Sequence, residues 1–290
     1  MTPTRPEWLL VDGSSLIFRA FFGVPRTIRA PDGTPVNAVR GFCDYLARFI
    51  TLRQPRRALV AADVDWRPQW RVELMPSYKT HRLNLQPEPD LERQIPIIAE
   101  VMEAVGIPML GAAGYEAEDV IATVAARANG LVEVVSGDRD LFALVRDPDV
   151  RVLFPEGKGQ LAEVDEAAVS ARYGIPGRSY LDFAILRGDP SDGLPGLAGV
   201  GPKKAAELLR RYGSVSGMLD KASLNQLDAD YLRRALKIVT PDATLSLNIP
   251  DSVLPPSPAQ PEWVDELKRA YALGGALDRL LRALAGATSV

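Results

Sequence analysis

Short apolar runs alternate with longer amphipathic stretches along the first half of the chain. Such runs, bounded by turn-forming residues, are typical of buried strands, whereas apolar residues three and four apart mark one face of a helix. We predict strands at 8–11, 58–62, 109–110, 132–136 and 150–154. We predict helices at 36–52, 90–105 and 115–129. Because strands alternate with helices, the pattern predicts an α/β fold with a mostly parallel sheet.

The second half of the chain has a different pattern. After about residue 160 the strand signals fade and helical spacing dominates, most clearly at 196–212 and 225–239. A proline cluster at 255–258 then precedes an amphipathic stretch from Glu262, which we predict to be one terminal helix.

A polar segment interrupts the α/β pattern at 64–90, where aromatic residues stand among several arginines. We expect an extended, partly helical excursion here rather than core. The chain then divides into an α/β domain over 1–160 and a helical region over 161–290, with the C-terminal helices packing back on the first domain.

Composition narrows the class of protein. With 290 residues and 47% hydrophobic content, the chain can bury a large core. Its apolar runs are too short to span a bilayer, and no secretory pattern opens the sequence. The single cysteine, Cys43, excludes an internal disulfide framework and cysteine-based zinc sites, so we expect a cytoplasmic protein. The net charge of −3 does not exclude a nucleic-acid partner, because acids that converge on metal ions leave a more basic remaining surface.

Aspartates follow three of the predicted strands. Asp12 and Asp63 come after the first two, and Asp138 and Asp140 come after the run at 132–136. The carboxyl ends of parallel strands meet at one edge of a sheet, where open α/β sheets bind their ligands. Asp138 and Asp140 are two residues apart, so in an extended segment their side chains point the same way.

Two further groups of acids stand in the sequence. Glu116, Glu118 and Asp119 open the predicted helix, where all three side chains share one arc of the first turn. Acids also favour the first turn of a helix because they complement its dipole, so this group alone leaves both interpretations open. Asp189 and Asp192 lie in a Gly-Asp-Pro-Ser-Asp-Gly segment that is equally typical of a simple turn.

These nine carboxylates would repel one another strongly if they met without bound cations. Oxygen ligands without histidine or cysteine suit hard ions such as Mg²⁺ or Mn²⁺. A pair of such ions can activate water and stabilise a leaving oxygen. The acids therefore predict metal-dependent hydrolysis of a phosphodiester.

Six motifs occur in order along the chain. They are Asp12-Gly13, Tyr78-Lys79-Thr80-His81-Arg82, Gly114-Tyr115-Glu116-Ala117-Glu118-Asp119, Gly137-Asp138-Arg139-Asp140-Leu141, Gly188-Asp189-Pro190-Ser191-Asp192 and Gly199-Val200-Gly201-Pro202-Lys203. Together they resemble the signatures of the bacterial 5′-nuclease family, which includes flap endonucleases and the 5′-nuclease domain of bacterial DNA polymerase I. The resemblance implies a PIN-like nuclease domain with a helical arch at about 64–95. It also implies a helix–three-turn–helix DNA-binding element at about 186–215.

The resemblance further implies two divalent cations and cleavage that leaves 5′-phosphate and 3′-hydroxyl ends. The ligands implied mainly for the catalytic ion are Asp12, Asp63, Glu116, Glu118 and Asp119. The ligands implied for the second ion, or shared with it, are Asp138, Asp140, Asp189 and Asp192.

Basic and aromatic residues supply the candidate substrate contacts. Lys79 and Arg82 are the candidate catalytic residues, because their charges neutralise negative charge that develops on a phosphate. The alternative for this segment is a solvated basic loop. The resemblance implies that Tyr78 stacks on a base near the cut. Arg19 and Arg71 are weaker DNA-binding candidates, and Arg71 suits an ion pair with a nearby glutamate or a surface position nearly as well.

A glycine-rich segment opens one helix of the second half. Gly199 and Gly201 let backbone N–H groups approach a phosphate, and Lys203 and Lys204 add positive charge. Alone, such a segment is also compatible with a tight turn. The segment offers no group that reads base edges, which favours recognition of the DNA backbone and shape. Members of the resembling family often hold a K⁺ ion here through backbone carbonyls.

Three residues depart from the family pattern. Glu118 stands where the family usually has Asp, which puts the metal preference in doubt because the carboxylate is one methylene further out. Gly193 stands where Asn is usual, so a hydrogen bond that fixes the loop is expected to be missing. Ala62 replaces a Phe, which affects packing more than chemistry.

The sequence therefore predicts a structure-specific 5′-nuclease that acts on DNA, as a flap endonuclease and 5′-3′ exonuclease in replication or repair. We expect a stand-alone monomer whose partner is 5′-flap, nicked, gapped or 5′-ended duplex DNA, with no membrane association. Two alternatives remain open at this point. One is a PIN-type ribonuclease, and the other is a branched-DNA binding module with weak catalysis.

Overall fold

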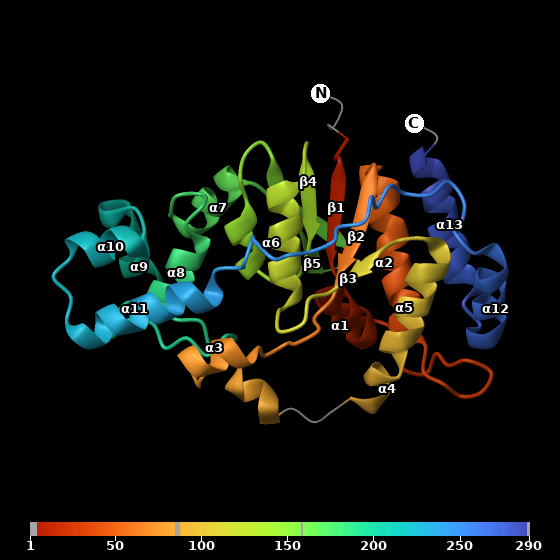
Figure 1. Ribbon diagram of the computed structural model, residues 1–290, viewed down its shortest axis with the longest axis horizontal. Helices are drawn as coiled ribbons and strands as arrows, with labels where there is room; N and C mark the ends of the chain where they lie inside the picture. Colours follow the sequence, from red (N-terminus) through yellow and green to blue (C-terminus); the bar gives the residue numbers. More distant parts are fainter. Residues whose placement is uncertain (1–4, 85–87, 158, 289–290) are drawn as a thin grey trace.

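The computed structural model of the protein describes residues 5–84, 88–157 and 159–288. Its centre is a sheet with the strand order β3-β2-β1-β4-β5-β6 (Figure 1). The strands are β1 (Trp8–Asp12), β2 (Arg57–Ala61), β3 (Met109–Leu110), β4 (Val132–Val135), β5 (Val150–Gly157) and β6 (Gln160–Val164). All paired strands run parallel except β5 and β6. The predicted α/β fold with a mostly parallel sheet is confirmed.

Strands β2, β1 and β4 lie side by side, which brings their carboxyl ends together. The register pairs Asp12, the last residue of β1, with Ala61, the last residue of β2. On the other side of β1, Val11 pairs with Val135 at the end of β4. The acids that follow these three strands therefore start from adjacent positions at one edge of the sheet.

Helices cover both faces of the sheet (Figure 1). They include α1 (Gly13–Gly23), α2 (Asn37–Arg53), α5 (Gln94–Val105), α6 (Ala117–Arg127), α12 (Pro261–Tyr271) and α13 (Gly274–Thr288). Leu9 and Val11 of β1 belong to the core that the sheet forms with α1, α2, α5, α12 and α13. Leu10 belongs to the opposite core, which α6 and the helical region complete. This division follows from the alternation of side chains along a strand.

The helical region lies beside one edge of the sheet, at the left of Figure 1. It consists of α7 (Glu166–Tyr173), α8 (Tyr180–Arg187), α9 (Pro202–Tyr212), α10 (Val215–Lys221) and α11 (Gln226–Val239). Helices α8 and α9 pack on each other and are joined by the turns at 188–201. After α11 the chain runs back across α6 toward the C-terminal helices (Figure 1). We call residues 240–249 the crossover segment.

The polar excursion after β2 contains α3 (Gln69–Leu74), the 3₁₀ helix η1 (Thr80–Asn84) and α4 (Pro89–Glu92). Helix α3 contacts α11 of the helical region. Residues 85–87 of the segment for which an arch was expected lie outside the described residues. No helix in the described part of the chain is both long and apolar enough to cross a membrane.

Several elements differ from the predictions. Asp12 does not open a turn but caps α1, which begins at Gly13 directly after β1. The stretch at 196–201 forms turns, and α9 begins only at Pro202. The single terminal helix is two helices, because Ala272 adopts the left-handed region with φ 52° and reverses the chain between α12 and α13. Strand β6 was missed, since its exposed positions break the apolar run.

Candidate active site

Asp12 lies where β1 passes into α1, at the middle of the carboxyl edge. Its Oδ1 accepts a hydrogen bond from the Ser15 backbone N–H at 3.0 Å, which caps α1. Its Oδ2 accepts one from the Ser136 hydroxyl at 2.5 Å, and Ser136 follows β4. Burial raises the pKa of Asp12 to about 7, against these two hydrogen bonds, and the charges of Asp138 and Asp63 add to the rise.

Asp63, Asp138 and Asp140 lie around the same edge. Asp63 is exposed, and its Oδ1 accepts a hydrogen bond at 2.7 Å from the backbone of Ala117, the first residue of α6. The segment of Asp138 and Asp140 is not extended as assumed above. Asp138 Oδ1 accepts from the Asp140 N–H at 3.0 Å, and Asp140 opens the 3₁₀ helix η2 (Asp140–Leu144). Asp138 is therefore exposed, while Asp140 is buried.

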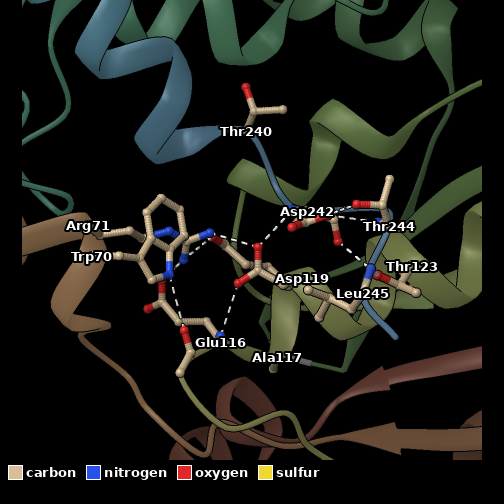
Figure 2. A network of polar contacts seen from close by, with 12 residues as sticks. Trp70, Arg71, Glu116, Ala117, Asp119, Thr123, Thr240, Asp242, Thr244 and Leu245 are labelled. Atoms are coloured by element: carbon tan, nitrogen blue, oxygen red, sulfur yellow. Dashed lines mark hydrogen bonds and ion pairs between the residues drawn. The ribbon is translucent and has the colours of Figure 1, made fainter. Parts of the chain in front are cut away.

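The acids at the start of α6 surround one buried cation, Arg71 of α3. The Arg71 guanidinium is fully buried, and Nη2 contacts Asp119 Oδ1 at 2.8 Å (Figure 2). Nη1 lies 3.0 Å from Glu118 and also pairs with Glu116. Burial alone would lower the pKa of Arg71, but the surrounding carboxylates raise it, so the group stays charged. Glu118 and Asp119 lie in the first turn of α6, whereas Glu116 is its N-cap and not part of the helix as predicted, and all three acids contact Arg71.

Tyr78 and Lys79 meet the same acids from the other side. The Tyr78 hydroxyl donates to Glu116 Oε2 at 2.6 Å, and Lys79 Nζ pairs with Glu116 Oε1. Lys79 Nζ also lies 4.0 Å from Asp192. Burial lowers the pKa of Lys79, but Glu118, Glu116 and Asp192 outweigh it and raise the pKa to about 12. Lys79 therefore carries its charge at neutral pH.

Two residues differ in placement from their predicted DNA-binding roles. The Tyr78 ring is 1% exposed, so in this structure its face is not available for stacking on a base. Arg71 is 0% exposed and pairs with the acids of α6 rather than with a neighbour on its own helix or with solvent. Both side chains instead lie buried against the acids at the start of α6.

The turn at 188–193 closes the site from the helical region. Asp189 pairs with Arg187 at 2.9 Å, and Asp192 is buried. Gly193 has no side chain to fix the loop, but the Ser77 hydroxyl donates to its backbone carbonyl at 2.9 Å. The Lys79 N–H donates to the Asp192 carbonyl at 3.2 Å. The turn and the segment at 77–79 thus hold each other in place.

Ion pairs divide the nine predicted metal ligands into two groups. Five have a cationic partner: Glu116, Glu118, Asp119, Asp189 and Asp192. The other four form no ion pair with any residue that the structure describes: Asp12, Asp63, Asp138 and Asp140. Burial raises the pKa of Asp140 well above its ordinary value, and the charges of Asp138 and Asp192 add to this. The unpaired group therefore has carboxyl groups in excess of cationic partners at the sheet edge, and burial favours the protonated forms of Asp12 and Asp140 when no metal ion is bound.

Divalent cations suit this excess, because the unpaired group offers only carboxylate oxygens. Within residues 5–84, 88–157 and 159–288, however, no three acid, histidine or cysteine side chains are arranged closely enough to hold an ion as they stand. The carboxylate oxygens are the donor type that a hard cation prefers. The side chains lie near one another, but they are not arranged in a coordination geometry.

The remaining predicted residues surround this centre. Arg19 lines an open cavity of about 480 Å³ together with Ser15 and Gly137 at the carboxyl edge, and it donates to the Pro155 carbonyl at 2.8 Å. Arg82 is partly buried on η1. The exposed residues at the N-terminus of α9 lie on the helical region, apart from the acids: Gly199, Gly201, Lys203 and Lys204.

Sequence reasoning missed four residues that hold the acids. Ser15 and Ser136 bond to Gly137 and Asp12, and a hydroxyl next to a strand end was a usable signal for Ser136. The Asp242 backbone N–H donates to Asp119, and the Thr123 hydroxyl donates to the Asp242 carbonyl and so holds the crossover segment (Figure 2). Backbone contacts between residues so far apart leave no trace in a sequence pattern.

Comparison with known proteins identifies the family of the chain. The family model of the 5′-3′ exonuclease N-terminal resolvase-like domain matches residues 7–174, and that of the C-terminal SAM fold matches 175–250. A 5′-3′ exonuclease of Streptomyces coelicolor is 46% identical over 299 residues, which cover 95% of this chain and 99% of that protein. A 5′-3′ exonuclease of Mycobacterium tuberculosis is 42% identical over 313 residues, covering 97% and 98%. DNA polymerase I of M. tuberculosis is 38% identical over 277 residues, covering 92% of this chain and 30% of the polymerase.

Solved structures share the fold at low sequence identity. The bacteriophage T5 D15 flap endonuclease, in a pseudo-enzyme-product complex with DNA and metal ions, matches with a TM-score of 0.64 at 17% identity, covering 98% of this chain and 99% of that one. Flap endonuclease-1 from Methanococcus jannaschii matches with a TM-score of 0.62 at 16% identity, covering 97% and 94%. By its family models and its relatives, the chain belongs to the 5′-3′ exonuclease family.

Proposed function

We propose that this protein hydrolyses DNA phosphodiester bonds as a 5′-nuclease, both as a 5′-3′ exonuclease and as a flap endonuclease, with divalent cations at the carboxyl edge of the sheet. The gathering of Asp12, Asp63 and Asp138 at the ends of three neighbouring strands carries this proposal. Their charge is not balanced by any described residue, and a phosphate would be repelled unless cations were bound between. The names of the relatives and the metal and DNA complex of a structural neighbour support it.

Asp12, Asp63, Asp138 and Asp140 would hold the cations, and the paired acids would border them. Two Mg²⁺ or Mn²⁺ ions would activate water and stabilise the leaving oxygen. Because burial raises the pKa values of Asp12 and Asp140, cation binding there would displace protons and would strengthen as the pH rises.

Lys79 and Arg82 would contact the reacting phosphate. Lys79 is held at the acids by Glu116 and remains charged, so its ammonium can neutralise charge that develops in the transition state without a proton transfer. Arg82 follows on η1 and provides a second, planar cation. Arg19 lines the cavity next to Gly137 and would hold a DNA phosphate there.

The helical region would bind duplex DNA away from the cut. Gly199 and Gly201 leave backbone groups exposed at the N-terminus of α9, and Lys203 and Lys204 extend into solvent beside them. Such a site holds a phosphate and carries no base recognition, so the preference for flap, nicked, gapped or 5′-ended duplexes would come from shape. A K⁺ ion at the turns before α9 would belong to the same function. We further propose a cytoplasmic monomer with a nuclease domain over 1–160 and a DNA-binding region over 161–290.

One cleavage assay tests these statements. End-labelled 5′-flap, nicked, blunt and single-stranded substrates, in DNA and in RNA, are incubated with Mg²⁺, with Mn²⁺ and with excess EDTA. We expect release of 5′-terminal products from the DNA substrates, and no cleavage in EDTA. Strong cleavage in EDTA would refute the metal proposal, and preferred cleavage of RNA would favour the ribonuclease alternative.

A further inference from the structure

The Asp119 side chain accepts three hydrogen bonds from within the chain, and both of its oxygens have partners. Oδ1 accepts from Arg71 Nη2 and from the Asp242 backbone N–H, each at 2.8 Å. Oδ2 accepts from the Glu116 N–H at 3.0 Å. The side chain is 0% exposed, and Figure 2 shows its contacts with Arg71 and Asp242. A carboxylate bound in this way has little left to offer a metal ion, and it joins three separate parts of the chain.

The first of these parts is the crossover segment. Thr123, one turn after Asp119 on α6, donates its hydroxyl to the Asp242 carbonyl at 2.8 Å and accepts from the Leu245 N–H at 3.3 Å. Arg127, a further turn along, donates to the carbonyls of Leu245 and Leu247. Hydrogen bonds therefore hold the crossover segment against α6. Among these contacts, the one made by Asp119 lies nearest to Glu116 (Figure 2).

The second part is α3, through Arg71. The guanidinium that contacts Asp119 also contacts Glu116 and Glu118, and Glu116 in turn holds Tyr78 and Lys79. The centre of the Trp70 ring lies 4.9 Å from the guanidinium, so the ring covers one side of Arg71. The ring is held there because its indole N–H donates to the Gly114 carbonyl at 3.1 Å. A displacement of Asp119 would thus reach Lys79 through Arg71 and Glu116.

We propose that Asp119 is a positioning residue, which ties the crossover segment to Arg71 and thereby holds Glu116, Glu118 and Lys79 at the reacting phosphate. This inference rests on the proposed nuclease function. It implies that the end of α11, in the region that would bind duplex DNA, is mechanically linked to the acidic site through one buried carboxylate. Helix α11 also contacts α3 directly, so both ends of the link belong to one packed unit.

A mutant cycle on Arg71 and Asp119 tests this role. Asp119→Asn keeps the shape and one acceptor oxygen but removes the charge. Arg71→Lys keeps the charge but cannot donate to three carboxylates at once. Single-turnover cleavage of a 5′-flap at saturating enzyme should slow by about 10- to 100-fold in each variant, as for residues that orient metal ligands. If Asp119 acts through Arg71, the double variant should be no more than about threefold slower than the slower single variant.

Mn²⁺ titration of the DNA-free protein supplies a readout that does not need cleavage. In a positioning role, Asp119→Asn and Arg71→Lys should change Mn²⁺ affinity by the same factor and leave the number of bound ions unchanged. Loss of one ion in Asp119→Asn, with wild-type binding in Arg71→Lys, would overturn the proposal and make Asp119 a ligand. Multiplicative rate losses in the double variant would also overturn it.

Thr123→Val tests the remote end of the link without altering an acid or a cation. Thr240→Val is its matched control, because the Thr240 hydroxyl bonds at 2.6 Å to Leu236 of its own helix and not to α6. Thr123→Val should speed hydrogen exchange in residues 240–249 and lower the single-turnover rate, with the Kd for flap DNA unchanged. Thr240→Val should match the wild-type protein in both measurements.

Wild-type cleavage by Thr123→Val, despite faster exchange in the crossover segment, would overturn the link. Circular dichroism and thermal unfolding must show each variant folded at the assay temperature. Should the wild-type protein cleave none of the substrates, the proposed function fails, and the exchange and Mn²⁺ measurements still decide whether Asp119 links the two parts.

Discussion

Gly193 is the position where a substitution toward the usual family residue should harm this protein. Its φ is +73°, and a Cβ added to it would lie 2.0 Å from the Ser77 carbonyl oxygen and 2.8 Å from its carbonyl carbon. An ordinary contact needs a separation of roughly 3.5 Å, so the turn at 188–193 would have to move by about 1.5 Å. Two hydrogen bonds span this gap, from Ser77 Oγ to the Gly193 carbonyl and from the Lys79 N–H to the Asp192 carbonyl.

The expected cost of Gly193→Ala follows from these contacts. Each lost hydrogen bond costs about 1 kcal/mol, and a left-handed alanine costs about 1–2 kcal/mol. The free energy of unfolding should therefore fall by about 3–4 kcal/mol, which lowers the Tm by roughly 7 °C for a chain of this size. Gly193→Asn has less backbone strain but the same clash, so it should also destabilise.

The catalytic effect should exceed the effect on DNA binding. Lys79 itself has a positive φ of 48°, a strained backbone that the bond to Asp192 helps to maintain. Displacing the turn frees this backbone, and a misplacement of about 1 Å can cost 100-fold in rate. Gly193→Ala should therefore lower kcat strongly while the Kd for flap DNA changes little.

Gly33→Ala is the control for backbone strain. Gly33 has a φ of +87°, and a Cβ there would meet nothing within 4 Å. Thermal unfolding should show only the strain of about 1–2 kcal/mol, and cleavage should be unaffected. Equal losses of Tm in Gly193→Ala and Gly33→Ala, or a wild-type kcat in Gly193→Ala, would refute the reasoning.

Three further predictions concern the acids and the two basic groups. Asp138→Asn should abolish cleavage and spare flap binding in a gel-shift assay, and normal turnover would mean that the site is misplaced. Lys79→Ala should lower the single-turnover rate, whereas the double variant of Lys203 and Lys204 to Ala should raise KM with kcat unchanged and reduce the salt dependence of binding by up to about two units of slope. In metal-free protein the pKa of Asp12 is about 7 in the folded state and about 3.9 in the unfolded state. Between these two values the folded state binds one proton more than the unfolded state. The free energy of unfolding should therefore fall as the pH rises from about 4 to 7. Denaturant unfolding in EDTA should show a loss on the order of 4 kcal/mol over this range that Asp12→Asn lacks, and an equal pH dependence in both proteins would contradict it.

The gathering of acids at the sheet edge was predictable because it depends on strand direction. Once β1, β2 and β4 are parallel neighbours, the residues after them must meet, whatever the details of packing. The acids of α6 were placed on one arc by the helical period for the same reason. The regular geometry of strands and helices was therefore sufficient to predict which carboxylates lie near one another.

The partners of these acids were not predictable. Arg71 lies in a short helix within an arginine-rich segment, where local sequence favours a solvated position, and only the tertiary fold surrounds it with three carboxylates. The burial of Tyr78 also depends on the tertiary fold, because its hydroxyl donates to Glu116, which is distant in sequence. The break between α12 and α13 was hidden because apolar spacing continues across it, although Gly274 and Gly275 follow directly.

The division of the acids into paired and unpaired groups reconciles a stable fold with an acidic site. Nine uncompensated carboxylates in one place would oppose folding before any cation arrived. Arg71, Lys79 and Arg187 pair with five of them from within the chain, and burial raises the pKa of Asp12 to about 7, so its partial protonation reduces the remaining repulsion. The protein can thus fold with its own cations in place, while the unpaired acids at the ends of β1, β2 and β4 have no protein cation that would compete with a divalent ion. Under the proposed function, the paired cations would hold the surrounding acids in place, and the unpaired acids would be left to bind the divalent ions.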